Sequence, residues 1–110
     1  MTSNLKLPLL LAGFITSQNN HDSTSFSNLF TADAQVKDEG MEYEGRDKIK
    51  AWNEMTNKKY QTHMEALHYE VDNGIDILTI LMSGTFPGSP VEARFYFEIK
   101  NDGIQSLTIQ

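Results

Sequence analysis

The chain has 110 residues, of which 39% are hydrophobic and 22% charged, which is typical of one globular domain spanning residues 1–110. Its net charge of −6 argues against nucleic-acid and anionic-membrane partners, because no cluster of Lys and Arg is present to neutralise phosphates. The absence of cysteine excludes disulfides, thiolate metal sites and cysteine nucleophiles.

The first expected element is a helix, although its leucine-rich sequence also resembles a short secretion signal. Residues 5–15 carry one positive charge, are too short to span a bilayer and lack a clear small-x-small cleavage site. Pro8 suits the first turn of a helix, where its missing N–H costs nothing. We therefore expect a core helix, a cytoplasmic protein and no membrane partner. The apolar stripe of this helix comprises Leu7, Leu10, Leu11, Phe14 and Ile15.

Two more helices and a strand pair are expected before residue 60. A polar turn at residues 19–23 offers Asp22 or Ser23 as the N-cap of a short second helix. Short strands at 34–38 and 41–44 would then flank a turn, and a third helix would run over 46–58. The apolar residues expected on the two helices are Phe26, Leu29 and Phe30 on the second, and Ile49, Trp52 and Met55 on the third.

The rest of the chain reads as strands, and Asn73-Gly74 is its strongest hairpin signal. Both faces of this hairpin are substantially apolar, so one face can pack on the helices while the other needs a second cover. A two-residue turn pairs Tyr69 with Leu78, Leu67 with Ile80, Glu65 with Met82, Glu70 with Ile77, His68 with Thr79 and Ala66 with Leu81.

The last hairpin allows two registers. A two-residue turn at Asp102-Gly103 would place Phe97 opposite Thr108 and leave the apolar face unpaired. A three-residue loop, with Gly103 in the left-handed conformation, pairs Phe97 with Leu107 and Phe95 with Ile109, and we expect this second register.

The segment between the last two hairpins, GTFPGSP at residues 84–90, is expected to be a connector without ligand contact. Pro87-Gly88 fits the central pair of a type II turn, and Pro90 can start a strand where no donor is required. The alternative is a lid in which Phe86 caps a cavity. The order ααββαββββ indicates an α+β domain with helices against one face of a curved antiparallel sheet.

Two segments carry a family resemblance. FTADAQVKDEGMEYEGRDKIKAW (30–52) and SGTFPGSPVEARFYFEIKNDGIQSLTI (83–109) resemble the SnoaL-like polyketide cyclases of the nuclear-transport-factor-2-like superfamily, which includes ketosteroid isomerases and scytalone dehydratases. The resemblance implies a cone-shaped α+β barrel, a curved antiparallel sheet wrapped around three helices with an apolar pocket. It also implies a homodimer through the outer sheet face.

The resemblance also implies site residues. Asp38 falls where the isomerases have their general base, and burial there would raise its pKa towards working pH. The two acidic donors that hold the enolate oxygen in the isomerases fall at Phe14 and Phe95, so we do not expect ketosteroid isomerase activity. Tyr43 and Tyr60 are alternative donors. The residues expected to line an apolar ligand pocket are Phe14, Phe30, Trp52, Phe95, Phe97 and Leu107.

Three functions from different classes remain open. The chain could be a proton-transfer enzyme (isomerase, cyclase or dehydratase) on a carbonyl-bearing substrate, a non-catalytic protein that binds a small apolar molecule, or a structural homodimer. His21, His63 and His68 lack metal-ligand spacing with a third ligand, so we expect neither a metal site nor a cofactor. The expected dimer surface combines Glu92, Arg94, Tyr96, Ser106 and Thr108 with an apolar patch of Met64, Ala66, Ile77 and Leu81.

Overall fold

Two helices, a strand pair, a third helix and four further strands follow one another along the chain, in the order that the sequence predicts. The computed structural model describes residues 5–110. The elements are α1 (Leu9–Asn19), α2 (Ser23–Asn28), β1 (Phe30–Asp38), β2 (Met41–Glu44), α3 (Arg46–Tyr60), β3 (His63–Asp72), β4 (Ile75–Ser83), β5 (Val91–Lys100) and β6 (Gly103–Ile109).

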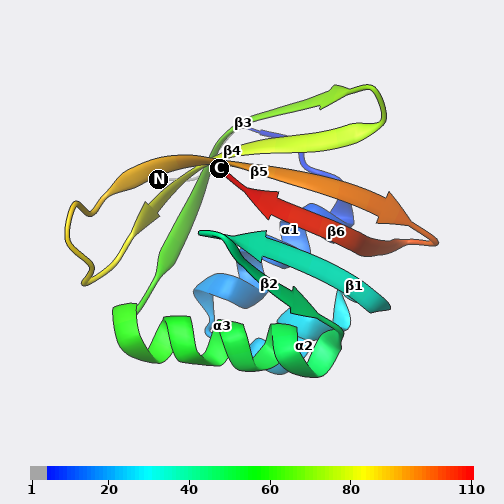
Figure 1. The fold of residues 1–110 in the computed structure, drawn as a ribbon. Coiled ribbons are helices and arrows are strands. Elements are labelled where there is room, and N and C mark those ends of the chain that lie inside the picture. Colours follow the sequence, from blue (N-terminus) through cyan, green and yellow to red (C-terminus); the bar gives the residue numbers. More distant parts are fainter. Residues whose placement is uncertain (1–4) are drawn as a thin grey trace.

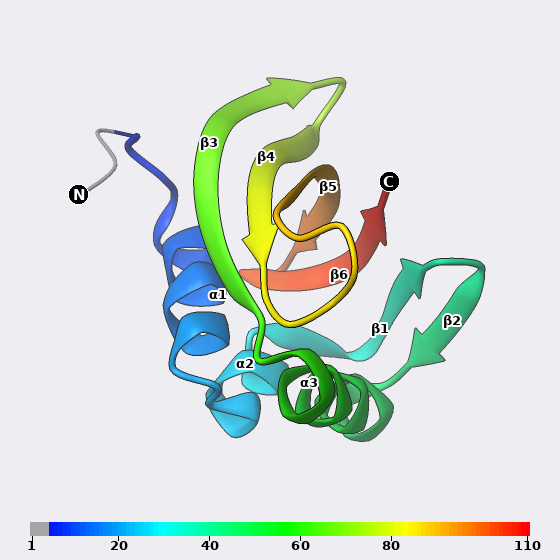
Figure 2. The same cartoon turned by 90° about the vertical axis from the view of Figure 1, so that its left-hand side faces the viewer.

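The six strands form one curved, unclosed sheet in the order β2-β1-β6-β5-β4-β3. Figures 1 and 2 show the sheet arching over the helices, with α3 lying across its open side. The predicted α+β class is therefore confirmed. The pairs are antiparallel except β1 with β6, which is parallel. No turn joins these two strands, so no hairpin imposes an antiparallel direction on them.

The core lies between the helices and the concave face of the sheet. The ring of Phe14, from α1, is fully buried at its centre. Its centroid lies 5.0 Å from that of Phe26, 5.1 Å from that of Phe97 and 6.0 Å from that of Phe95. Other fully buried apolar residues are Leu11, Val36, Ile49, Leu78, Ile80, Ile104 and Leu107.

The helix starts follow the sequence with one small shift. The Asp22 carboxylate caps α2 by accepting hydrogen bonds from the backbone N–H of Ser25 at 3.1 Å and from the Ser25 hydroxyl at 2.8 Å. These two bonds lower the pKa of Asp22. Pro8 stands at the N-cap of α1 rather than inside its first turn. Met55 of α3 is 56% exposed, whereas Ile49 and Trp52 of the same helix are buried.

The β3–β4 hairpin turns at Asn73-Gly74, as predicted, and both residues have positive φ. The pairs nearest the turn are confirmed, including Tyr69 with Leu78. Beyond His68 a bulge shifts the register by one residue. Ala66 pairs with Ile80, Glu65 with Leu81 and Met64 with Met82, so the predicted pairs Leu67–Ile80, Ala66–Leu81 and Glu65–Met82 are wrong.

The β5–β6 hairpin has the predicted register, but its turn differs from the predicted one. Phe97 pairs with Leu107 and Phe95 with Ile109, which confirms both pairs. The left-handed residues are Asn101 and Asp102, with φ of 52° and 63°, and not Gly103. A register shift between Glu98 and Ile99 then restores the apolar alignment. A side chain at position 103 would meet Thr31, since a Cβ there would lie 3.0 Å from its Cγ2.

Candidate functional site

A cavity of about 640 Å³ opens between α3, the end of β1 and the start of β5. Figure 2 shows the β4–β5 connection curling back towards α3 at this side of the molecule. Most of the lining is apolar or aromatic, as is typical of small-molecule sites. The lining residues are Gln18, Asp38, Glu39, Met41, Tyr43, Trp52, Asn53, Met55, Thr56, Lys59, Tyr60, Thr62, Met64, Met82, Phe86, Pro87, Val91 and Ile109.

Aromatic rings and methionines form the apolar wall. Tyr43 of β2 and Trp52 of α3 stack with their ring centroids 5.5 Å apart and their planes 26° from parallel. Four methionines also line the cavity, of which Met41 and Met55 are exposed, Met82 is partly buried and Met64 is buried. Methionine side chains are flexible and polarizable, so this wall can adapt to ligands of different shape.

Asp38 lies in the wall of this cavity, at the C-terminal end of β1. It is half-buried, while Val36 of the same strand parity is fully buried in the core. Burial raises the pKa of Asp38 above its ordinary value of 3.8, and the neighbouring Glu39 carboxylate raises it further. A carboxylate in such surroundings is a stronger base towards a bound ligand than one in water.

The predicted ligand-binding residues divide into two groups. Trp52 lines the cavity. Phe14, Phe30, Phe95, Phe97 and Leu107 are at most 1% exposed, lie in the core and are absent from the cavity wall, so their contact with a ligand stays a prediction. The four phenylalanine rings pack against one another and fill the space between α1 and the sheet.

The loop at residues 84–90 contributes to the cavity wall, so it is more than a remote connector, and whether it contacts a ligand stays a prediction. Phe86 and Pro87 line the cavity, and the Phe86 ring packs edge-on against Tyr60 at 5.9 Å. The N–H of Thr85 donates to the Tyr60 carbonyl at 2.7 Å. Gly84 permits this approach, since a Cβ there would lie 2.5 Å from the same oxygen. The loop is thus anchored to the end of α3.

Buried amides and a buried threonine hydroxyl form one section of the polar cavity wall, and sequence reasoning missed them. Gln18 of α1 and Asn53 of α3 are 2% and 3% exposed, and Thr62 is 5% exposed. They share a hydrogen-bond network with Asn57 and Ser23, with donor–acceptor distances of 2.5 to 3.2 Å. Asparagines four residues apart on the apolar side of a helix were the available signal.

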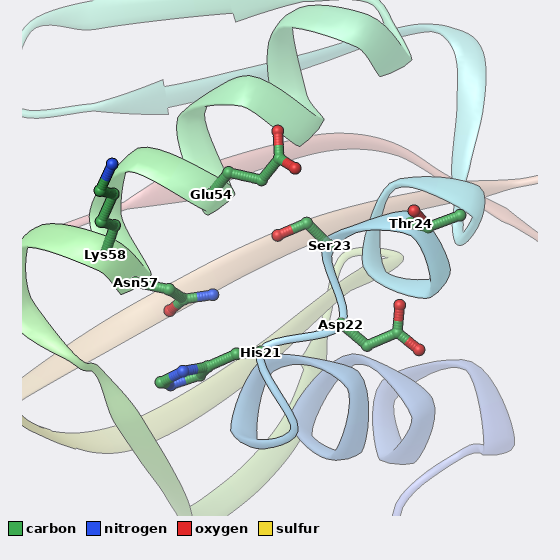
Figure 3. A pocket seen from close by; sticks show the side chains of 7 residues that line it. All are labelled: His21, Asp22, Ser23, Thr24, Glu54, Asn57 and Lys58. Atoms are coloured by element: carbon green, nitrogen blue, oxygen red, sulfur yellow. The ribbon is translucent and has the colours of Figure 1, made fainter.

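Behind this network lies a shallower depression of about 430 Å³ between α2 and α3 (Figure 3). Figure 3 shows Ser23 and Asn57 pointing toward one another across it. His21 has a structural role here, because its Nε2 lies 2.8 Å from the Thr62 carbonyl oxygen. The residues lining the depression are His21, Asp22, Ser23, Thr24, Glu54, Asn57 and Lys58.

The remaining polar candidates lie apart from the cavity. His68 and Glu70 form an exposed pair, 3.3 Å apart, on β3, and Asp33 is exposed and accepts from the Thr31 hydroxyl at 3.2 Å. Within residues 5–110, no three His, Asp or Glu side chains are grouped so that they could hold a metal ion. Over the same residues, no helix has the length and apolarity needed to cross a membrane.

Comparisons with known proteins agree on the fold. The model of the SnoaL-like domain family matches residues 11–106. A candidate polyketide cyclase from Sinorhizobium meliloti is 33% identical, with a TM-score of 0.90 over 94% of this chain and 95% of its own. A protein with a ketosteroid isomerase-like fold from Catenulispora acidiphila, solved with trimethylamine, is 16% identical, with a TM-score of 0.84 over 96% and 86%.

A third solved structure, an NTF2-like protein of unknown function from Cytophaga hutchinsonii, is 14% identical, with a TM-score of 0.79 over 100% of this chain and 93% of its own. A search of curated proteins gave no match. At identities this low, the second and third structures show the fold alone. The family match covers nearly all of the described chain.

Proposed function

Because the chain belongs to the SnoaL-like domain family, we propose that its cavity binds a small, apolar, carbonyl-bearing molecule and that Asp38 transfers a proton on it. The observation that carries this proposal is the place of Asp38, a carboxylate with a raised pKa in the wall of a largely apolar cavity. A carboxylate there can remove a proton next to a carbonyl group and return it elsewhere on the same molecule. The reaction class is isomerisation, cyclisation or dehydration.

Ligand binding is the first part of the proposal to test. An acetylnaphthalene combines an apolar ring system with one carbonyl, and we expect it to shift the NMR signal of the indole N–H of Trp52, the chain's one tryptophan. Filling the cavity with Met82→Trp should weaken binding, measured by calorimetry, about tenfold or more. Ile99→Trp, at an exposed site outside the cavity, is the matched control. An unchanged indole signal at saturating ketone would contradict the proposed cavity function.

A second candidate function is binding without catalysis. It is favoured by the positions where the related isomerases carry their enolate-stabilising donors, which are Phe14 and Phe95 in this chain. A phenylalanine side chain has no hydrogen-bond donor, and both rings are fully buried in the core, 6.0 Å apart. Losing such donors typically forgoes several kcal/mol of transition-state stabilisation. Proton exchange on a bound ketone that depends on Asp38 would support catalysis, and its absence would support binding alone.

We also propose that two copies of the chain associate through the convex face of the sheet. The β3 bulge turns Met64 and Ala66 into the core, so they do not belong to the outer patch on which they were predicted. Ile77 and Leu81 remain on the convex face, and Ile77 pairs with Tyr96 across the strands. These half-buried apolar residues support an interface.

The dimer proposal predicts that the native chain at micromolar concentration sediments with the coefficient expected for a dimer. Ile77→Arg places a charge within the proposed interface and should give the monomer. Val71→Arg, at a 58% exposed site near the hairpin tip, should leave the dimer intact. A native chain that sediments as a monomer would refute the interface.

A further inference from the structure

Each of the two asparagines in the buried amide network donates one hydrogen bond through Nδ2 and has a second N–H unused within residues 5–110, but only Asn53 lines the large cavity. Gln18 uses both protons of Nε2, donating to Asn57 Oδ1 at 2.7 Å and to Thr62 Oγ1 at 2.9 Å. Asn53 Nδ2 donates to Gln18 Oε1 at 2.7 Å. That bond uses one of its two N–H groups, and no residue in the part of the chain that the structure describes accepts from the other.

The side-chain oxygens of the two asparagines, unlike their N–H groups, are fully used. Asn53 Oδ1 accepts from the Ser23 hydroxyl and from Asn57 Nδ2, and Asn57 Oδ1 accepts from Gln18 and Thr62. A carbonyl oxygen holds two lone pairs, so both asparagine oxygens are saturated. What Asn53 still offers is a donor. Its side chain is 3% exposed and lines the large cavity, where a spare N–H without an acceptor is costly.

We propose that Asn53 forms a ligand subsite, in which its free Nδ2–H donates to a carbonyl oxygen of the molecule that occupies the cavity. This inference rests on the proposed function. The hydrogen bonds to Gln18, Ser23 and Asn57 hold the carboxamide in place from three sides, so little side-chain freedom is lost on binding. The subsite selects ketones over hydrocarbons of the same shape, because only the ketone satisfies the buried donor.

Two ligands of equal shape test this subsite. An acetylnaphthalene and the isopropenylnaphthalene of the same substitution differ in one group, C=O against C=CH₂. We expect the native chain to bind the ketone about fivefold to tenfold more tightly, measured by calorimetry. If both ligands bind equally, the subsite is refuted while the apolar cavity stands. If neither binds, the cavity function and the subsite are refuted together.

A matched pair of variants assigns the preference to one residue. Asn53 and Asn57 each make three hydrogen bonds in the network, but Asn53 lines the cavity and Asn57 lines the outer depression of Figure 3. Asn53→Ala should abolish the preference for the ketone, and Asn57→Ala should retain it. A preference that survives Asn53→Ala, or that is lost in both variants, overturns the assignment.

Both variants disturb a buried network, so a measurement on the native chain completes the test. The side-chain amide protons of Asn53 give their own NMR signals, identifiable through contacts with its β-protons. We expect the ketone to shift one of these two proton signals downfield and the alkene to leave it in place. Equal shifts with both ligands would show that no hydrogen bond to the ligand oxygen forms.

Discussion

Phe14→Ala should lower the free energy of unfolding by about 3–5 kcal/mol, the range for removing a fully buried aromatic side chain. The ring lies at the centre of the core and packs against four other phenylalanine rings at centroid distances of 5.0 to 6.5 Å. Truncation removes these contacts and leaves a void, because the sheet and α2 cannot both close over it. Chemical denaturation of the native and variant chains measures the loss.

The control for this variant is Leu9→Ala in the same helix. Leu9 is 92% exposed, so its truncation should change stability by no more than about 0.5 kcal/mol. Phe14→Tyr separates a core role from a ligand-binding role, since it adds a hydroxyl at a site with no exposed surface. Stability should fall and ketone affinity should stay unchanged. A variant of unchanged stability that binds the ketone more tightly would place position 14 in the ligand site.

The fold was predictable because its main signals are local. Asn73-Gly74 specifies a two-residue turn, and Asp22 specifies a helix start, without reference to the rest of the chain. The wrong predictions concern features that depend on contacts between segments far apart in the sequence. The bulge beyond His68 has no signal in alternating hydrophobicity, since Leu67 continues the apolar pattern yet is 41% exposed. The parallel pairing of β1 with β6 likewise depends on packing between segments far apart in sequence.

The site was predictable in part, for a related reason. Asp38 and Trp52 were named through the family resemblance, and both line the cavity, while their roles towards a ligand stay predictions. The buried amide network was missed because Gln18, Asn53 and Thr62 come from three separate segments, and only the tertiary fold brings them together. The loop at 84–90 was expected to be a connector without ligand contact because turn chemistry accounts for nearly all of its residues. The curvature of the sheet brings Phe86 to the cavity wall instead.

Asp38→Asn should slow proton exchange on a bound ketone by about a hundredfold or more, the usual contribution of a positioned general base. The exchange of the methyl protons of an acetylnaphthalene with deuterium from solvent measures this step directly, since it needs removal of a proton next to the carbonyl. The amide is close in size to the carboxylate but cannot accept the proton. Binding of the ketone should persist in the variant, and Asp33→Asn, at an exposed site outside the cavity, is the matched control.

The pH dependence gives this prediction a second readout. Asp38 acts as a base when ionised, so exchange should rise with pH through its raised pKa and level off above it. The folded-state pKa lies above the unfolded value, so ionisation favours the unfolded chain; the cost is absent below 3.8 and complete above the raised pKa. Asp38→Asn should therefore melt at a higher temperature than the native chain at neutral pH, and the difference should vanish in acid. Exchange equally fast in both chains would leave the cavity with a binding function only.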